Sequence, residues 1–267
     1  MDLDLIRKIE DEVIKMGEDW ATEIIRLPEV IIYLNATAPE EHFLNYTFGI
    51  TDPQNIPEFV SKVEGIFEER KAKPNFSIAP YTSAGLKDYL LNNGYEQESN
   101  NAWMFFDRKK EVPEFGSLEF EIKKVKNEEE FKEFARVMVE VFSKGEEDDP
   151  YQGFSTKWGE VLLDQYRDKG KDYLLETFLV YMDNQVVGGA QLLYKGEIGY
   201  LDWLSVLPKF RKLGIGKALQ GTRVKRAKEL GAKYICLITE VGSRNERIFT
   251  KFGFRTEFTA QDLIRSN

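Results

Sequence analysis

A short run near the end of the chain has residue types and spacing suited to anion binding. Val206 to Leu219 reads VLPKFRKLGIGKAL, so Arg211 stands three residues before Gly214 and five before Gly216. Glycines lack side chains, so successive backbone N–H groups of such a turn can converge on an anion at the N-terminus of the next helix. The run therefore predicts a site for a pyrophosphate group.

Two basic side chains strengthen this prediction. Arg211, with Lys212 as a further candidate, would add charge-assisted hydrogen bonds, each worth about 1.5–3 kcal/mol. A Gly-x-Gly pair alone indicates no more than a tight turn. The run lacks the third glycine of a dinucleotide fingerprint and the Gly-Lys-Ser/Thr ending of a P-loop, so NAD and ATP sites are disfavoured.

The full run resembles the signature of the GNAT superfamily, Gln/Arg-x-x-Gly-x-Gly/Ala. The preceding Val206-x-Pro208 and the following Lys217-Ala218-Leu219 match as well. The resemblance implies the GNAT fold and acyl-CoA binding along two splayed strands, with acetyl-CoA as cosubstrate and no metal. It assigns the following residues to the coenzyme: Leu204, Ser205, Val206, Arg211, Lys212, Leu213, Gly214, Ile215, Gly216, Lys217, Asn245 and Phe249.

Asp202 is the candidate catalytic residue. GNAT enzymes transfer the acyl group directly to an amine, which attacks only when it is neutral, and a carboxylate often removes its proton. Asp202 resembles that acidic residue in strand and spacing, and it stands among apolar residues in the segment YLDWLSV. A charged residue is unusual in a buried strand. A structural or substrate-orienting role is the open alternative.

The last helix departs from the family pattern. Many members place a tyrosine there as general acid, but counting back from Gly253 puts Phe249 at that position. A phenyl ring has no proton to donate. Either the acid is dispensable, or water or another residue supplies it. Asn245 fits a coenzyme contact and a helix cap about equally well.

Composition excludes several classes of function. The formal net charge of −9 argues against nucleic acid as a partner and fits a cationic or small neutral ligand. His42 is the only histidine and Cys236 the only cysteine, so no zinc-ligand spacing exists, and we expect His42 on the surface. No apolar run is long enough to span a bilayer, and the start lacks a signal-peptide pattern, so we expect a cytoplasmic protein.

The pattern of elements predicts a mixed α/β fold with two GNAT-like halves, 1–112 and 113–267. Residues 109–117 read as a linker. The second half predicts strands at 118–125, 178–182, 185–193, 199–206 and 234–238. Helices are expected from Asn127, over 156–167 and after Gly216. Antiparallel strands combined with a helical crossover favour a mixed sheet flanked by helices.

The first half echoes this pattern without its phosphate-binding motif. Helix-like spacing covers 59–67 and 86–90, and Leu90–Glu96 resembles Ile248–Phe254, each with a helix end, a glycine and an aromatic residue. This similarity indicates an internal duplication. Residues 48–57 have no Gly-x-Gly and no basic side chain, so we expect this half to be a degenerate domain that helps to form the acceptor pocket.

The leading hypothesis is therefore an N-acetyltransferase acting on a primary amine of a small molecule or peptide. An acidic loop at 146–149 fits attraction of a cationic amine or a solvated surface loop. The alternative is a non-catalytic acyl-CoA-binding regulatory module. Transfer of an amino acid from tRNA is a third possibility, disfavoured by the acidic balance.

Overall fold

The computed structural model describes residues 1–113, 119–144, 155–168 and 171–266. The chain forms two compact units. The first contains residues 1–103, 239–242 and 256–267, and the second contains 104–238 and 243–255. Strands β5 (Tyr95–Phe106) and β12 (Phe254–Arg265) therefore contribute to both units. The C-terminal strand segment groups with the first unit, whereas the sequence predicted a linear division at residue 112.

The first unit is a mixed sheet with helices. Its strands follow the order β1-β2-β3-β4-β12-β5. β3 and β4 are parallel and are joined through α2, while β12 is antiparallel to β4. Its other elements are α1 (Leu3–Lys15), η1 (Glu18–Trp20), β1 (Glu23–Leu27), β2 (Val30–Leu34), β3 (Tyr46–Phe48), α2 (Ile56–Glu69), β4 (Asn75–Ile78) and α3 (Ala84–Asn92).

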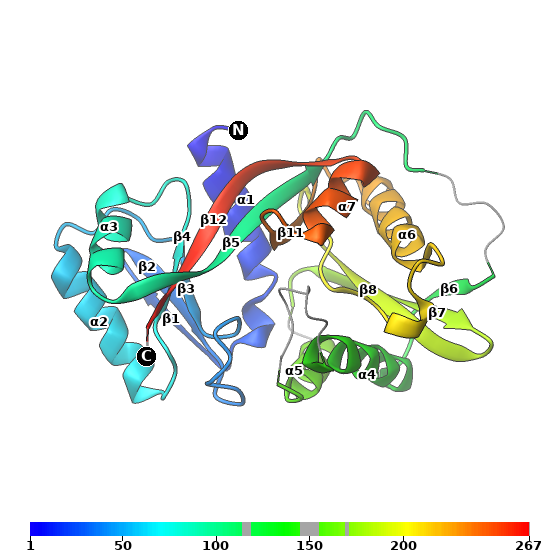
Figure 1. Cartoon of the computed structure of the whole chain (residues 1–267), viewed down its shortest axis with the longest axis horizontal. Coiled ribbons are helices and arrows are strands. Elements are labelled where there is room, and N and C mark those ends of the chain that lie inside the picture. The colour runs from blue at the N-terminus through cyan, green and yellow to red at the C-terminus, as the bar shows by residue number, and fades with distance from the viewer. Residues whose placement is uncertain (114–118, 145–154, 169–170, 267) are drawn as a thin grey trace. The chain divides into compact units, whose positions relative to one another are not determined.

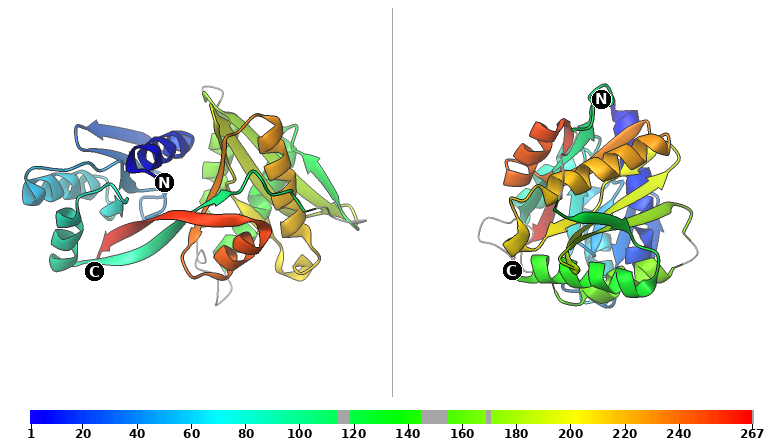
Figure 2. Two further views of the ribbon diagram at one scale, coloured as in Figure 1. Left: turned by 90° about the horizontal axis from the view of Figure 1, so that it is seen from above. Right: turned by 90° about the vertical axis from the view of Figure 1, so that its right-hand side faces the viewer.

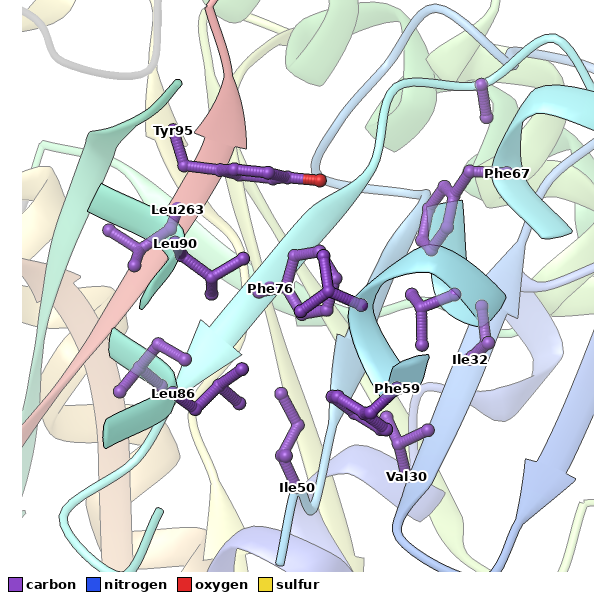
Figure 3. Packing of buried hydrophobic residues seen from close by; sticks show 14 of the residues in the cluster. Val30, Ile32, Ile50, Phe59, Phe67, Phe76, Leu86, Leu90, Tyr95 and Leu263 are labelled. Atoms are coloured by element: carbon purple, nitrogen blue, oxygen red, sulfur yellow. The ribbon is translucent and has the colours of Figure 1, made fainter. Parts of the chain in front are cut away.

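An apolar core joins α2 and α3 to this sheet (Figure 3). Phe59 and Phe67 of α2 and Leu86 and Leu90 of α3 are buried against strand residues. The partner pair Phe76 and Leu263 belongs to the same cluster, so the C-terminal strand is part of this core. Burying a side chain of this size stabilises the fold by about 1.5–3 kcal/mol, which explains why the C-terminal strand is held here.

The second unit carries the elements expected of the second half. Its sheet has the order β11-β9-β8-β7-β6, with β10 also paired to β8. Helices α4 and α5 cover one face, and α6 and α7 cover the other (Figures 1 and 2). Its other elements are β6 (Glu121–Lys124), α4 (Glu128–Lys144), α5 (Trp158–Arg167), β7 (Leu174–Met182), β8 (Gln185–Lys195), β9 (Ile198–Tyr200), β10 (Leu204–Val206), η2 (Pro208–Phe210), α6 (Ile215–Glu229), β11 (Tyr234–Glu240) and α7 (Arg244–Phe252).

The mixed α/β architecture predicted from the sequence is therefore confirmed. Its local signals behave as expected. The Asn127 side chain accepts from the Glu130 N–H at 2.9 Å and caps α4. Asp183 and Asn184 have φ of 51° and 60° in the turn between β7 and β8, which suits a tight hairpin. Among the described residues, no helix combines the length and apolarity needed to cross a membrane.

One predicted strand is wrong. Residues 199–206 were expected to form a continuous strand, but β9 ends at Tyr200 and β10 begins at Leu204. Trp203 in the gap has φ of 34°, which an extended strand does not allow. The interruption lets β8 pair with β9 through Leu193–Lys195 and with β10 through Gly188–Ala190. We call residues 201–203 the β9–β10 break.

Candidate active site

The glycine-containing turn lies where the sequence placed it, between β10 and α6. Lys212 and Gly214 have positive φ of 67° and 84°, and Gly214 is the N-cap of α6. The first helical hydrogen bond runs from Ala218 N–H to the Gly214 carbonyl at 2.9 Å. The amides of Ile215, Gly216 and Lys217 precede it and so have no acceptor inside the helix. These amides and the positive end of the helix dipole suit an anion.

The side chains of this turn divide into buried and exposed groups. Arg211 is half-buried, and its Nε donates to the Val206 carbonyl at 3.1 Å. Ile215 is buried in the core, whereas Lys212, Leu213 and Lys217 are exposed. The exposed cations can reach a phosphate from solvent. Ile215 can offer only its backbone.

Strand β10 exposes one backbone edge. Ser205 is opposite Gly189, and the Leu207 N–H donates to the Val187 carbonyl at 2.9 Å. Because backbone groups alternate in direction along an antiparallel strand, those of Leu204 and Val206 point away from β8. Among the described residues β10 pairs with β8 alone. The backbone groups of Leu204 and the N–H of Val206 can therefore bind a ligand, whereas the Val206 carbonyl already accepts from Arg211 and the groups of Ser205 are used by β8.

The neighbouring strand diverges from β10. β11 is parallel to β9 over Tyr234–Cys236, and the Leu201 N–H donates to the Cys236 carbonyl at 2.8 Å. No pairing of β11 with β10 follows within the described part of the chain. The two strands thus separate at the β9–β10 break, as the resemblance implied.

Asp202 lies in this break. Its Oδ1 accepts from the Trp203 N–H at 2.9 Å, and its Oδ2 is buried without a hydrogen bond of normal geometry among the described residues. Burial raises the pKa of Asp202 to about 7, opposed by the Trp203 N–H, the Arg223 charge and Tyr200. A carboxyl with this pKa can take up and release a proton near neutral pH.

An aromatic group lies beside Asp202. The Trp203 ring contacts Phe142 of α4 at a centroid distance of 5.3 Å and Trp158 of α5 at 5.1 Å, both edge to face. These contacts tie the break to the helices that precede and follow residues 145–154. The acidic loop considered from the sequence, 146–149, falls outside the described residues.

Helix α7 differs from the expectation at its start. Ser243, not Asn245, caps the helix, because its Oγ accepts from the Glu246 N–H at 3.0 Å. Asn245 is half-buried within the first turn. Phe249 is half-buried and packs edge to face on Phe254, with ring centroids 6.1 Å apart. Phe249 thus provides an apolar surface and cannot act as a general acid.

His42 lies in the first unit. It was expected on the surface, but its side chain is only 22% exposed. Burial lowers its pKa, against the nearby carboxylates Glu98 and Asp262. No group of three or more His, Cys, Asp or Glu residues suited to a metal occurs among the residues described.

Sequence reasoning missed Arg223, a residue of α6 whose side chain is buried. Its guanidinium donates to the Asp202 carbonyl at 2.7 Å. A signal was present, because Leu219, Arg223 and Ala227 follow one another at four-residue spacing on the buried face of α6. An arginine in an apolar helical stripe requires buried acceptors.

Comparison with known proteins agrees with this architecture. Residues 139–254 match the model of the acetyltransferase (GNAT) family. No curated protein matches the chain by sequence. A GCN5-related N-acetyltransferase from Kribbella flavida is 16% identical, with a TM-score of 0.69 over 98% of this chain and 95% of that chain.

Further solved structures share the fold over most of the chain. A functionally unknown conserved protein from Staphylococcus epidermidis is 14% identical, with a TM-score of 0.67 over 98% of this chain and 99% of that one. A tandem GNAT protein from the clavulanic acid biosynthesis pathway is 9% identical, with a TM-score of 0.64 over 88% and 77%. Residues 139–254 thus resemble the GNAT family model, and the chain shares its fold with GNAT proteins over nearly its whole length.

Proposed function

We propose that the protein is an acyl-CoA-dependent N-acyltransferase that moves an acetyl group from acetyl-CoA to a primary amine. The observation that carries the proposal is the position of Asp202, in the break from which β10 leads into the glycine-containing turn. A coenzyme held by the turn and by the free edge of β10 would bring its thioester toward that break. The thioester and the carboxylate of Asp202 would then lie close together at the break.

The turn would bind the pyrophosphate through the amides that begin α6. Gly214, with φ of 84°, lets the chain enter the helix without strain. A β-carbon at Gly216 would make only ordinary contacts with the Leu204 and Val206 side chains, at 3.7 and 3.9 Å, so Gly216 lies next to β10. Arg211, Lys212 and Lys217 add positive charge, and Leu213 and Ile215 complete the turn. Leu204 and Val206 would hold the pantetheine arm with their backbone groups. Asn245 and Phe249, both half-buried, would line the coenzyme with their side chains, whereas Ser205 is buried and its backbone pairs with β8.

Asp202 would act as the general base. The amine nitrogen attacks the thioester carbonyl, the new C–N bond forms, and the C–S bond breaks as the CoA thiolate departs. The amine proton passes to Asp202, directly or through water. Such proton transfer contributes about 10²–10⁴-fold to rate. A thiol has a pKa near 8.5, so its thiolate leaves readily and Phe249 need not donate a proton.

The acceptor is proposed to be a small-molecule or peptide amine. The net charge of −9 favours a cationic acceptor over a nucleic acid. The first half is proposed to be a degenerate GNAT-like domain, because β3, α2, β4, α3 and β5 repeat the order of β10, α6, β11, α7 and β12. Residues 49–55, between β3 and α2, hold no Gly-x-Gly.

The test measures free thiol released from acetyl-CoA over a panel of amines, polyamines, aminoglycosides and peptides. The proposal expects release that depends on the amine and falls in Asp202→Asn. A non-catalytic acyl-CoA-binding module is the second candidate, supported by Phe249 at the position of the family tyrosine. Coenzyme binding without turnover on any amine would favour that candidate.

A further inference from the structure

Arg223 is a buried cation at the centre of the second unit. The residue is 1% exposed, in the middle of α6. Removing a charged side chain from water costs several kcal/mol unless hydrogen bonds and an opposite charge compensate. The hydrogen-bond acceptors and charges around Arg223 therefore indicate its role.

The guanidinium binds backbone oxygens of the break. Its NH1 donates to the carbonyls of Asp202 at 2.7 Å, Gln191 at 2.9 Å and Trp203 at 3.2 Å. Its NH2 donates to the Gln220 side-chain oxygen. NH1 of Arg223, on α6, thus connects β8 with two residues of the break, Asp202 and Trp203.

These contacts support an uncommon backbone conformation. Trp203 has φ of 34°, which costs a residue with a side chain about 1–3 kcal/mol. The Gln191 N–H donates to the carbonyls of Asp202 and Trp203, each at 3.1 Å, so both oxygens accept from β8 and from α6. Because each carbonyl accepts from two donors, the backbone of Asp202 is held in place, and this fixes the direction in which its side chain points.

The guanidinium of Arg223, 2.7 Å from the Asp202 backbone oxygen, is also close enough to act on the Asp202 side chain through its charge. Asp202 is faced by Arg223 from α6 and by Tyr200 from β9. Burial lowers the pKa of Arg223 to about 9, so the guanidinium stays protonated at neutral pH. Its positive charge favours the ionised form of Asp202 and opposes the effect of burial.

We propose that Arg223 is a positioning residue for the acyl transfer, which fixes the backbone of Asp202 and Trp203 and supplies a buried positive charge to the Asp202 carboxylate. The inference rests on the proposed role of Asp202 as base. The two contributions, geometry and charge, separate in different variants. Arg223→Gln removes the charge but keeps N–H donors, while Arg223→Lys keeps the charge but loses the planar fork.

The first measurement needs no substrate. The Asp202 carboxyl is titrated by ¹³C NMR in the labelled full chain and assigned by its loss in Asp202→Asn. Arg223→Gln should raise its midpoint by about 1 pH unit, because an opposite charge is lost. Arg223→Lys should leave it near the parent value. Lys225→Gln, which removes an exposed cation of the same helix, is the control and should change nothing.

The second measurement is the pH dependence of kcat and of kcat/KM with the amine of the panel that gives the fastest thiol release. The acid limb is read from kcat/KM, which reports ionisations of the free enzyme. In Arg223→Gln, the acid limb of the profile should shift to higher pH by the same amount as the Asp202 titration midpoint. Arg223→Lys should lower kcat at least about 10-fold without moving the limb, because misplacing a reacting group costs rate even when its protonation is unchanged.

Distinct outcomes separate the two ideas. A folded Arg223→Gln variant with an unmoved Asp202 midpoint would overturn the charge role, and a parent-like kcat in Arg223→Lys would overturn the positioning role. The kcat of Arg223→Lys tests the positioning role even if Arg223→Gln fails to fold. A moved midpoint with an unmoved kinetic limb would uphold the effect of Arg223 on Asp202 and contradict Asp202 as the base.

Discussion

A β-carbon added to Gly188 would lie 2.8 Å from the carbonyl oxygen of Ser205. Gly188 is opposite Val206 in the pairing of β8 and β10, so the missing side chain lets the two strands approach. The edge of β10 that faces away from β8 is positioned by this contact. The close approach thus links a glycine of β8 to the edge of β10 that is proposed to bind the coenzyme.

Gly188→Ala should displace β10 and destabilise the protein by about 1–3 kcal/mol, because the backbone oxygen cannot move aside without cost. It should also weaken coenzyme A binding. Thermal unfolding and titration calorimetry measure the two effects. Gly65→Ala in α2 is the control, since its β-carbon would meet nothing within 4 Å. That control should leave stability unchanged or raised, and equal behaviour of the two variants would count against the close approach.

Asp202→Asn should preserve coenzyme affinity and lower turnover about 10²-fold or more at neutral pH. The pKa of Asp202, raised to about 7 by burial, predicts that the parental rate falls as pH drops below 7, because the protonated carboxyl cannot accept a proton. The loss in the variant should shrink toward pH ~10, where a lysine-like amine is neutral without help. Steady-state kinetics of the parent and the variant across this pH range measure both effects. A loss that is the same at every pH indicates misplaced substrate, and full activity throughout makes Asp202 structural.

Glu176 on β7 holds a buried ion pair whose stability should depend on pH. Its carboxylate accepts from Arg226 at 2.8 and 3.0 Å and from Lys124 at 3.0 Å. Burial acts to raise the pKa of Glu176, but these hydrogen bonds outweigh it and hold the pKa below the ordinary 4.5. A lowered pKa stabilises the fold above the unfolded value, and this contribution disappears as pH falls through the folded pKa.

Glu176→Gln should therefore cost about 1–3 kcal/mol at pH 7. The difference from the parent should shrink below pH 4.5. Urea unfolding at several pH values measures it. Glu197→Gln breaks the exposed pair with Lys233 and should cost clearly less than Glu176→Gln, because solvent screens the charges of that pair. Equal costs for both variants at pH 7 would refute the importance of burial.

Phe249→Tyr tests whether the reaction lacks a protein general acid. If the thiolate leaves unassisted, a hydroxyl at this position should change kcat by less than about 3-fold, since a thiol of pKa near 8.5 is a good leaving group. Its ring packing on Phe254 should persist. Phe249→Leu, which keeps an apolar side chain, controls for altered packing. A gain of 10-fold or more confined to the tyrosine variant would show that protonation of the thiolate limits the parent.

Short-range signals predicted most of the second unit. Asn127 identifies the start of α4, Asp183 and Asn184 identify a hairpin turn, and the glycine-containing run identifies the entry to α6. Each depends on backbone preferences of a few neighbouring residues. The same applies to the helix ends at Gly94 and Gly253, which both have positive φ and are followed by an aromatic residue that begins a strand.

Long-range features escaped prediction. The break at 201–203 depends on Arg223, about twenty residues later, and on Gln191 of β8, so no local pattern marks it. The placement of Leu263 in the first core follows from pairing with Phe76, far away in the sequence. Such choices depend on tertiary contacts rather than on local propensity.

Calorimetric titration of coenzyme A into the full chain tests the central claim most directly. We expect one site per chain, strongly weakened by Gly214→Val, because a β-branched residue resists the positive φ of 84° and fills the space of the pyrophosphate. Gly196→Val is the matched control, since Gly196 also has positive φ, 57°, but lies between β8 and β9. It should lose stability and keep its coenzyme affinity. Two equivalent sites per chain, or parental affinity in a folded Gly214→Val variant, would contradict the assignment of coenzyme binding to the turn before α6.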